Sequence, residues 1–174
     1  MTAWRTEGGS AIDRARSLRF TFDGRVIEGF AGDTVASALL AGGVSVLGRS
    51  FKYHRPRGLW GAGVEEPNAL VDIAGDMPNT RATQALAVDG MAVRSVNADP
   101  SAEKDRHAFL DAFARFIPAA FYYKTFMVPD WHSFEPRIRQ MAGLGVLDEA
   151  IQSPAFAEQI NHHCDVLVVG AGPA

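Results

Sequence analysis

An α+β fold is predicted, in which a small sheet wraps around one short helix as in a β-grasp domain. Three observations support it. An Asp-Gly pair joins two strand-like runs, a short apolar helix ended by two glycines follows, and further short strands come next. The 174 residues suffice for one ordinary domain with additional chain, and a chain of this length can bury a hydrophobic core.

Composition excludes several classes of function. Hydrophobic residues make up 47% and charged residues 21% of the chain, as in globular proteins. The net charge of −3 argues against binding of nucleic acid. The single cysteine, Cys164, excludes an internal disulfide and any site that needs several thiolates. Because the sequence shows no long apolar run and no signal peptide, we expect a cytoplasmic protein that does not enter the membrane.

The first predicted element is a hairpin, which follows an N-terminal tail over residues 1–17. Apolar and polar side chains alternate over residues 18–22, which is the period of a half-buried strand. Asp23-Gly24 then suits a two-residue turn, because both positions of such a turn need positive φ angles. Residues 25–30 are expected to return as the second strand.

A short helix is expected over residues 35–41. Asp33 suits its N-cap, and Val35 and Leu39 are spaced to face a core. The pair Gly42-Gly43 suits the end of the helix, where glycine adopts the left-handed conformation without strain.

Four short strands are expected after the helix, with one long loop among them. Together with the hairpin and the helix they complete the predicted β-grasp domain, which spans residues 18–98. The predicted strands are residues 44–47, 68–73, 81–88 and 91–96, and the predicted loop is residues 48–63.

Residues 99–163 are predicted to form a helical and aromatic connecting segment. A helix is expected to start at Asp99-Pro100 and to end at Pro118, and a shorter one to open at Pro136. One face of the first helix carries Phe109, Ala112, Phe113 and Phe116. A second aromatic group favours a core or a subunit interface over a cofactor pocket, and it comprises Phe121, Tyr122, Tyr123, Phe126 and Trp131.

Residues 164–174 resemble the first strand and loop of a dinucleotide-binding domain. The continuous apolar run over residues 166–169 is typical of a strand buried in a parallel sheet. An ordinary strand ending is the alternative interpretation. Because the helix that completes phosphate binding is not in the sequence, we interpret this domain as truncated and expect no tight dinucleotide binding. The incomplete loop consists of Gly170, Ala171, Gly172, Pro173 and Ala174.

One segment, residues 48–58, concentrates positive charge without any acidic residue. It is a candidate to bind an anion such as a phosphate, or an acidic partner surface, and a solvated loop is the alternative. Its candidate residues are Arg49, Lys52, His54, Arg55 and Arg57.

No catalytic residue and no metal ligand is predicted. The adjacent histidines His162 and His163 would point to opposite sides of an extended chain, which is unsuited to a zinc site that also uses Cys164. Neither a Ser-His-Asp arrangement nor a pair of catalytic carboxylates is evident.

Several motifs, in this order, resemble the N-terminal portion of the α subunits of heterotetrameric sarcosine oxidases. The resemblance runs from about Leu18 to the end of the chain. The motifs are GRSFKYHRPRG at 48–58, GVEEPNALVDI at 63–73, PNTRATQ at 78–84, DGMAVRSVN at 89–97, AAFYYKTFM at 119–127 and CDVLVVGAGPA at 164–174.

The resemblance implies a [2Fe–2S] ferredoxin-like domain without its cluster. Related amine and opine oxidoreductases carry four cysteine ligands in the regions that match Leu59–Leu70 and Arg81–Thr83, where this chain has none. Since such a cluster needs four ligands, we expect no iron–sulfur cluster.

The family reaction implied is the oxidative demethylation of sarcosine to glycine, with production of hydrogen peroxide and transfer of the one-carbon unit to tetrahydrofolate. The partners implied are the β, γ and δ subunits, with FAD and FMN in the complex and NAD in the full α subunit. The piece in hand would be a scaffold and docking domain, inactive and without cofactor when alone. A stand-alone interaction module, or the cluster-less domain of a related amine or opine oxidoreductase, is the alternative.

Overall fold

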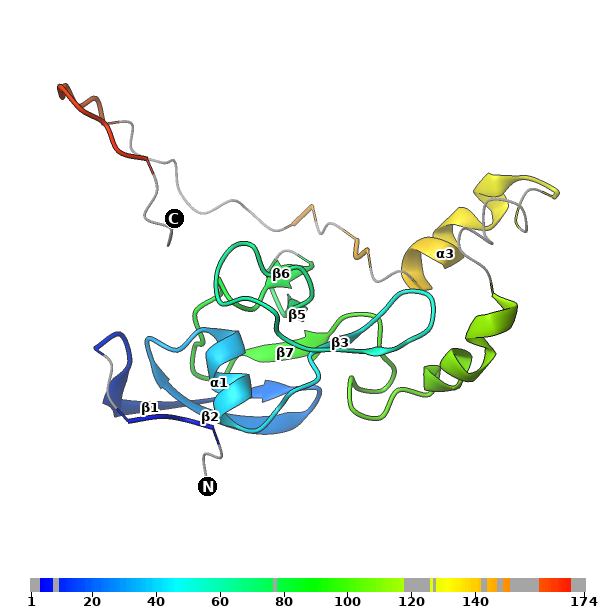
Figure 1. The fold of residues 1–174 in the computed structure, drawn as a ribbon, viewed down its shortest axis with the longest axis horizontal. Coiled ribbons are helices and arrows are strands. Elements are labelled where there is room, and N and C mark those ends of the chain that lie inside the picture. The colour runs from blue at the N-terminus through cyan, green and yellow to red at the C-terminus, as the bar shows by residue number, and fades with distance from the viewer. Residues whose placement is uncertain are drawn as a thin grey trace.

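A mixed five-stranded sheet forms the centre of the computed structural model (Figure 1). Its strand order is β2-β1-β7-β5-β6; β1 pairs antiparallel with β2 and parallel with β7, as in a β-grasp sheet. The strands are β1 (Asp13–Phe22), β2 (Arg25–Ala31), β5 (Leu70–Ile73), β6 (Thr80–Arg81) and β7 (Ala92–Ser95). The structure describes residues 4–7, 10–76, 78–117, 126, 128–141, 144–146, 149–150 and 160–169.

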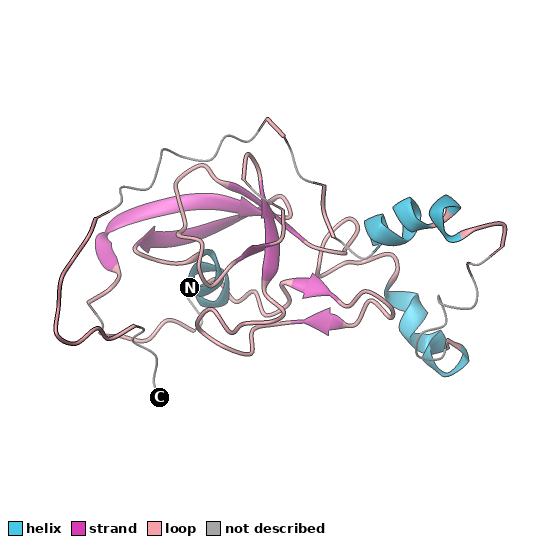
Figure 2. Cartoon of the chain, turned by 90° about the horizontal axis from the view of Figure 1, so that it is seen from above, coloured by secondary structure: helices cyan, strands magenta, loops and turns pink. Residues whose placement is uncertain are grey.

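Helix α1 (Val35–Ala41) lies on one face of this sheet (Figure 2). Phe20 and Ile27 from the hairpin pack with Val35 and Leu39 from the helix, and none of the four side chains is more than 2% exposed. The mixed sheet with one helix confirms the predicted α+β, ferredoxin-like class. The observed bounds of α1, residues 35–41, are those predicted.

The predicted hairpin is confirmed, and it is longer than expected. Asp23 and Gly24 have φ angles of 49° and 80°, as the tight turn requires. Strand β1 begins at Asp13, so the prediction of a tail over residues 1–17 is wrong for its last five residues. The irregularity in the pairing between Asp13 and Ser17 explains the error, because a bulge interrupts the alternation of side chains.

The N-cap of α1 is Thr34, and not Asp33 as predicted. The Thr34 hydroxyl accepts a hydrogen bond from the N–H of Ser37 at 3.1 Å. Asp33 lies one residue earlier, is fully buried and accepts two hydrogen bonds from the side chain of Arg5. The C-terminal stop is confirmed, since Gly42 is the C-cap and Gly43 has a φ angle of 78°.

Two of the four later strands are confirmed as β5 and β7, and two predictions are wrong. Residues 44–47 form no strand; instead β3 (Gly48–Arg49) and β4 (Pro56–Arg57) pair within the predicted loop. Leu47 is buried without belonging to a strand, so its apolar character reflected packing on the core. Within residues 81–88 the chain turns directly after β6, which pairs with β5 over two residues.

The first helix of the connecting segment begins later than predicted. It is a 3-10 helix, η1 (Ala108–Phe116). It starts late because residues 99–107 form a loop, in which the carboxylate of Asp105 accepts the N–H groups of Asp99 and His107. A shorter helix, α3 (Glu135–Met141), opens next to Pro136 as predicted and follows the single turn η2 (Trp131–Ser133). Pro118 and the aromatic run over residues 121–125 lie outside the described residues.

Residues 160–169 form no strand, which contradicts the prediction for residues 164–169. Val166 to Val169 are between 75% and 86% exposed, and Figure 1 shows this segment away from the sheet. An apolar strand is stable only where neighbouring strands take its backbone hydrogen bonds, and no described segment pairs with it. Among the described residues, no helix has the length and apolar character needed to cross a bilayer.

Candidate functional site

The clearest polar centre of the domain is the carboxylate of Glu66. This side chain is 1% exposed and lies in the Glu66 loop, which we define as residues 59–69, between β4 and β5. Four backbone N–H groups of the same loop converge on it. The donors are Trp60 at 2.6 Å and Gly61 to one oxygen, and Asn68 at 2.7 Å and Ala69 at 3.3 Å to the other.

These four hydrogen bonds favour the charged form of Glu66. Burial alone would raise the pKa of the carboxyl group, but the N–H groups outweigh burial and hold the pKa below its ordinary value of 4.5. The centre of the Glu66 loop therefore carries a full negative charge at neutral pH, with backbone amides on both sides.

The Glu66 loop is closed by contacts with the turn after β6. The Thr83 hydroxyl donates to the carbonyl of Gly63 at 2.8 Å, and the N–H of Ala82 donates to the carbonyl of Ala69 at the same distance. Ala69 and Ala82 are fully buried, and Thr83 is 5% exposed. The Glu66 loop before β5 and the turn after β6 thus enclose the Glu66 carboxylate together.

The predicted basic segment is fastened to the loop after β7. The ring Nδ1 of His54 lies 2.6 Å from the carboxylate of Asp105, and both side chains are buried. Arg49 donates to the backbone carbonyls of Ala102, Glu103 and His54. His54 and Arg49, two of the candidates for binding an anion or an acidic partner surface, hold two parts of the chain together.

The pKa of Asp105 is also lowered. Its burial would raise the pKa, but hydrogen bonds from the N–H groups of His107 and Asp99 and from His54 keep it below the ordinary value. His107 lies on the other side of the same carboxylate, at 3.6 Å from Asp105. The hydrogen bond between His54 and Asp105 satisfies both side chains, so a hydrogen-bonded cluster accounts for the group of His54, Asp105 and His107 without a metal ion.

The remaining cations of the basic segment are more exposed. Arg55 makes an ion pair with Asp111 of η1 at 2.6 Å, and both side chains are about half exposed. Lys52 and Arg55 each lie 4.8 Å from the ring of Tyr53. The side chain of Arg57 is exposed on β4 and makes no hydrogen bond or ion pair with another described residue. Of the predicted anion-binding residues, Arg57 is therefore the best placed to meet another molecule.

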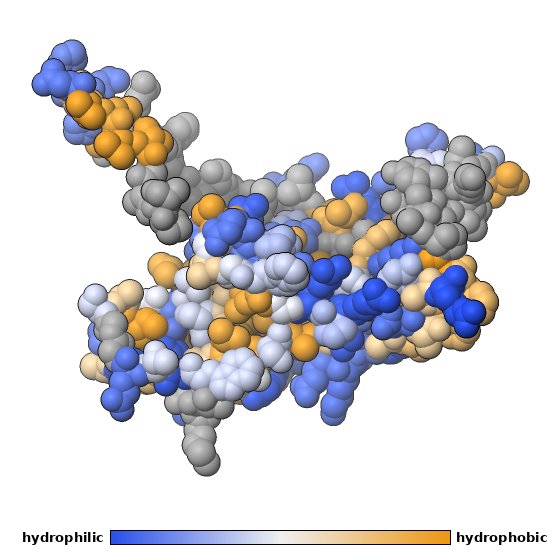
Figure 3. Space-filling view, in the orientation of Figure 1, coloured by the Kyte–Doolittle hydropathy of each residue, from blue (hydrophilic) through white to orange (hydrophobic). Residues whose placement is uncertain are grey.

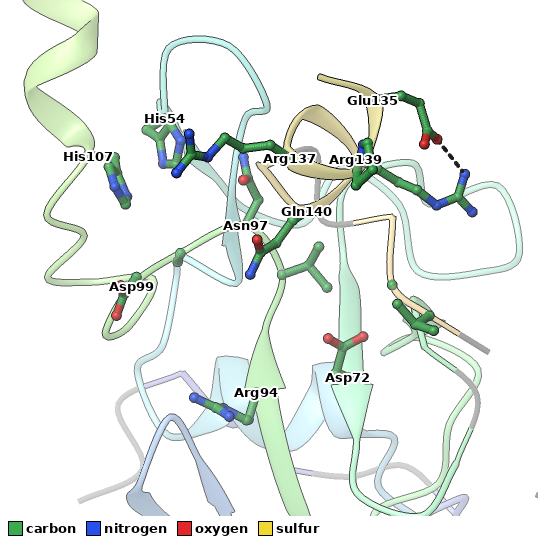
Figure 4. Close-up of a pocket in the computed structure, with 15 residues that line it drawn as sticks. His54, Asp72, Arg94, Asn97, Asp99, His107, Glu135, Arg137, Arg139 and Gln140 are labelled. Carbon is green, nitrogen blue, oxygen red and sulfur yellow. Dashed lines mark ion pairs between the residues drawn. The ribbon is translucent and has the colours of Figure 1, made fainter. Parts of the chain in front are cut away.

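A cavity of about 860 Å³ separates the sheet from α3. Figure 4 shows Arg137 extending from α3 into this space in the direction of His54, whereas Arg139 turns toward Glu135, 3.6 Å away. Asp72 lies deeper, and its carboxylate accepts the N–H of Asn79. Because acids and bases both line the cavity, its charge does not select one class of ligand.

The predicted dinucleotide loop, residues 170–174, lies outside the described residues. The sequence reasoning in turn did not single out Glu66 or Asp105. No local pattern marks Asp105, because its partner His54 is 51 residues away. Glu66 had one signal, since an acidic residue stands within a loop rich in glycine and small side chains.

Residues 15–98 match a family model described as "2Fe-2S iron-sulfur cluster binding domain". Such a cluster requires four protein ligands, usually cysteine thiolates. The single cysteine, Cys164, is exposed and lies outside the matched residues. The Glu66 loop presents a carboxylate and backbone amides, so the residues present do not fit the cluster.

Three curated proteins named sarcosine oxidase subunit alpha are similar over nearly the whole chain. The protein from Rhizobium meliloti (strain 1021) is 48% identical over 179 residues, or 99% of this chain. Those from Corynebacterium sp. strains U-96 and P-1 are 36% identical over 95% and 94% of it. The chain spans 18% of the length of the first relative and 13% of the other two.

One solved structure, the L-proline dehydrogenase from P. horikoshii, is similar at 26% sequence identity. The similarity covers 47% of this chain and 16% of that one, with a TM-score of 0.40.

Proposed function

We propose that this chain, which matches the N-terminal part of sarcosine oxidase α subunits, is a scaffold and docking domain of that enzyme and performs no redox step itself. One feature supports the absence of a redox role. Residues 15–98 match a cluster-binding family model, yet they contain no cysteine, because the single cysteine of the chain is Cys164.

The observation that carries the docking role is the aromatic face of η1. Phe109, Phe113 and Phe116 are 59%, 51% and 71% exposed, and Phe109 and Phe113 stack edge to face. Figure 3 shows hydrophobic residues next to hydrophilic ones in the region of this helix. A soluble domain rarely exposes three aromatic rings on one helix turn after turn unless another surface covers them.

The exposed cation Arg57 extends this surface to charged partners. It lies on β4, in the segment that Arg55 ties to η1 through Asp111. We assign the aromatic face and the basic segment to one contact area with the rest of the enzyme. An acidic rim on the partner would complement it.

The chemistry of the whole enzyme then lies outside these residues. We propose that the complex oxidises sarcosine with FAD and FMN, passes the one-carbon unit to tetrahydrofolate, and holds NAD in the α subunit. The β, γ and δ subunits are the proposed partners. This part of the proposal is supported by the identity to curated α subunits.

Co-expression with the β, γ and δ subunits tests the proposal. The chain should co-purify with partner subunits, and flavin absorbance should appear only in the complex. The purified chain alone should bind no flavin and should oxidise no sarcosine. Sarcosine oxidation by the chain alone, or a folded chain that never co-purifies with any subunit, would contradict the proposal.

A further inference from the structure

We infer that Glu66 takes the structural place of the iron–sulfur cluster, as the buried anion around which the Glu66 loop folds. The inference is independent of the proposed partners. It starts from spacing: ferredoxin-type clusters of the plant class are held by C-x4-C-x2-C and a fourth, distant cysteine. With Glu66 as the second position, the first is Gly61 and the third is Ala69.

Both of these flanking residues are among the four that donate hydrogen bonds to Glu66. Gly61 and Ala69, the flanking positions of the spacing, both donate their N–H groups to the Glu66 carboxylate. The three positions therefore surround one point in space, as the ligands of a single cluster must. With the spacing moved back by one residue, the flanking positions Trp60 and Asn68 also donate to Glu66, but the second position becomes Glu65, whose side chain is exposed and lies outside this convergence.

Thr83 supplies the fourth position. It is buried, it follows β6, and its hydroxyl reaches into the Glu66 loop to the carbonyl of Gly63 at 2.8 Å. The fourth cluster ligand is likewise a residue distant in sequence that must reach into the loop. The side chains at all four positions are small or, at Glu66, directed inward.

A loop around a cluster and the Glu66 loop both require a buried negative charge at the centre. Four thiolates and a [2Fe–2S] core form a buried anion, and hydrogen bonds to its sulfurs stabilise it. Removing the anion from such a loop leaves buried N–H groups without an acceptor, at a cost for each of them. The carboxylate of Glu66 accepts four of these groups and so preserves the fold of the loop without metal.

Restoring the ligands tests the inference directly. The variant G61C/E66C/A69C/T83C is made in the full chain with Cys164→Ser, so that no other thiol is present. A Cβ at Gly61 would meet the end of the exposed and flexible Glu65 side chain at 2.7 Å, which can move aside. The purified variant is treated anaerobically with ferrous iron, sulfide and dithiothreitol.

We expect about two irons and two acid-labile sulfides per chain, with visible absorption and an electron paramagnetic resonance signal after reduction. The matched control keeps Gly61 and carries the other three cysteines; with one ligand missing, it should retain less than about a tenth of that iron. A folded four-cysteine variant that binds no more iron than this control overturns the inference.

Single substitutions keep the inference testable if the four-cysteine variant does not fold. Glu66→Ala should lower the thermal midpoint by more than about 5 °C, because four backbone donors, one buried and three partly buried, lose their acceptor. Glu66→Gln should also lower the thermal midpoint, because the NH₂ group of the glutamine would face N–H donors. Glu65→Ala is the control, because that exposed side chain makes one hydrogen bond, to Gly63. Equal midpoints for the Glu66 and Glu65 variants would overturn the inference.

Discussion

The guanidinium of Arg5 forms a bidentate ion pair with the carboxylate of Asp33, with distances of 3.1 and 2.7 Å. The Asp33 side chain is fully buried and that of Arg5 is 9% exposed. Asp33 also accepts hydrogen bonds from the Ser37 hydroxyl and the N–H of Phe30. The pair thus fastens the N-terminal residues to the start of α1, which makes them part of the domain.

Replacement of Arg5 should destabilise the domain. We expect Arg5→Ala to lower the free energy of unfolding by about 3 kcal/mol, because it leaves the buried Asp33 charge without its main partner. Arg19→Ala is the control, since Arg19 pairs with Glu28 on the surface, where both side chains are at least 70% exposed. Urea unfolding followed by circular dichroism measures both. A loss no greater for Arg5→Ala than for Arg19→Ala would refute the structural role of the pair.

Stability should decline in acid. Burial would raise the pKa of Asp33, but its hydrogen bonds, first from Arg5 and then from Ser37, lower it, and the pKa values of Glu66 and Asp105 are lowered too. A carboxyl group whose pKa is lower in the folded state stabilises the fold at pH values above its unfolded pKa. That stabilisation is lost as the pH falls through the folded pKa.

We therefore expect the free energy of unfolding to be constant near neutral pH and to fall below the ordinary carboxyl values of 3.8 to 4.5. Asp105→Asn should make the fall less steep, because one of the three groups then no longer titrates. Unfolding curves collected from pH 7 to pH 3 provide the measurement. An Asp105→Asn curve parallel to that of the unmodified chain would show that the carboxylate contributes nothing to the acid sensitivity.

The aromatic face of η1 should be needed for assembly and dispensable for folding. Phe113→Ser replaces a half-exposed ring, so we expect little change in stability and at least about a tenfold weaker interaction with the co-expressed subunits. Val26→Ser, at a 61% exposed position on β2, is the control for the loss of an apolar side chain elsewhere. Equal recovery of the complex with both variants would place the docking surface on another face.

The basic segment can be divided into an internal and an external part. Arg57→Glu should weaken assembly at least about tenfold without loss of stability, since the Arg57 side chain makes no hydrogen bond or ion pair with another described residue. Arg55→Glu should also loosen η1, because it places a second negative charge beside Asp111. The double variant R55E/D111R restores the pair with reversed charges and should recover the lost stability. Unchanged assembly and flavin content in Arg57→Glu would leave the segment as a solvated turn.

Several elements followed from local patterns. Asp23-Gly24 predicted the hairpin, Gly42-Gly43 predicted the end of α1, and alternation over residues 68–73 placed β5. Strands β3 and β4 were not predicted, because two residues are too few to show a period. The apolar run at 166–169 was read as a buried strand, but among the described residues no neighbouring strand pairs with it.

The positions of turns and apolar faces were readable from the chain alone, because they depend on φ angles and on neighbours a few residues away. The long-range partners of the carboxylates depended instead on how the chain closes on itself. Asp23 looked like a turn residue, yet its carboxylate accepts the N–H groups of Ser95 and Ala102, the second of them 79 residues away. A buried charge is stable only where donors surround it. Glu66 takes all four donors from its own loop, whereas Asp33 and Asp105 each need a side chain from a distant segment, Arg5 and His54 respectively.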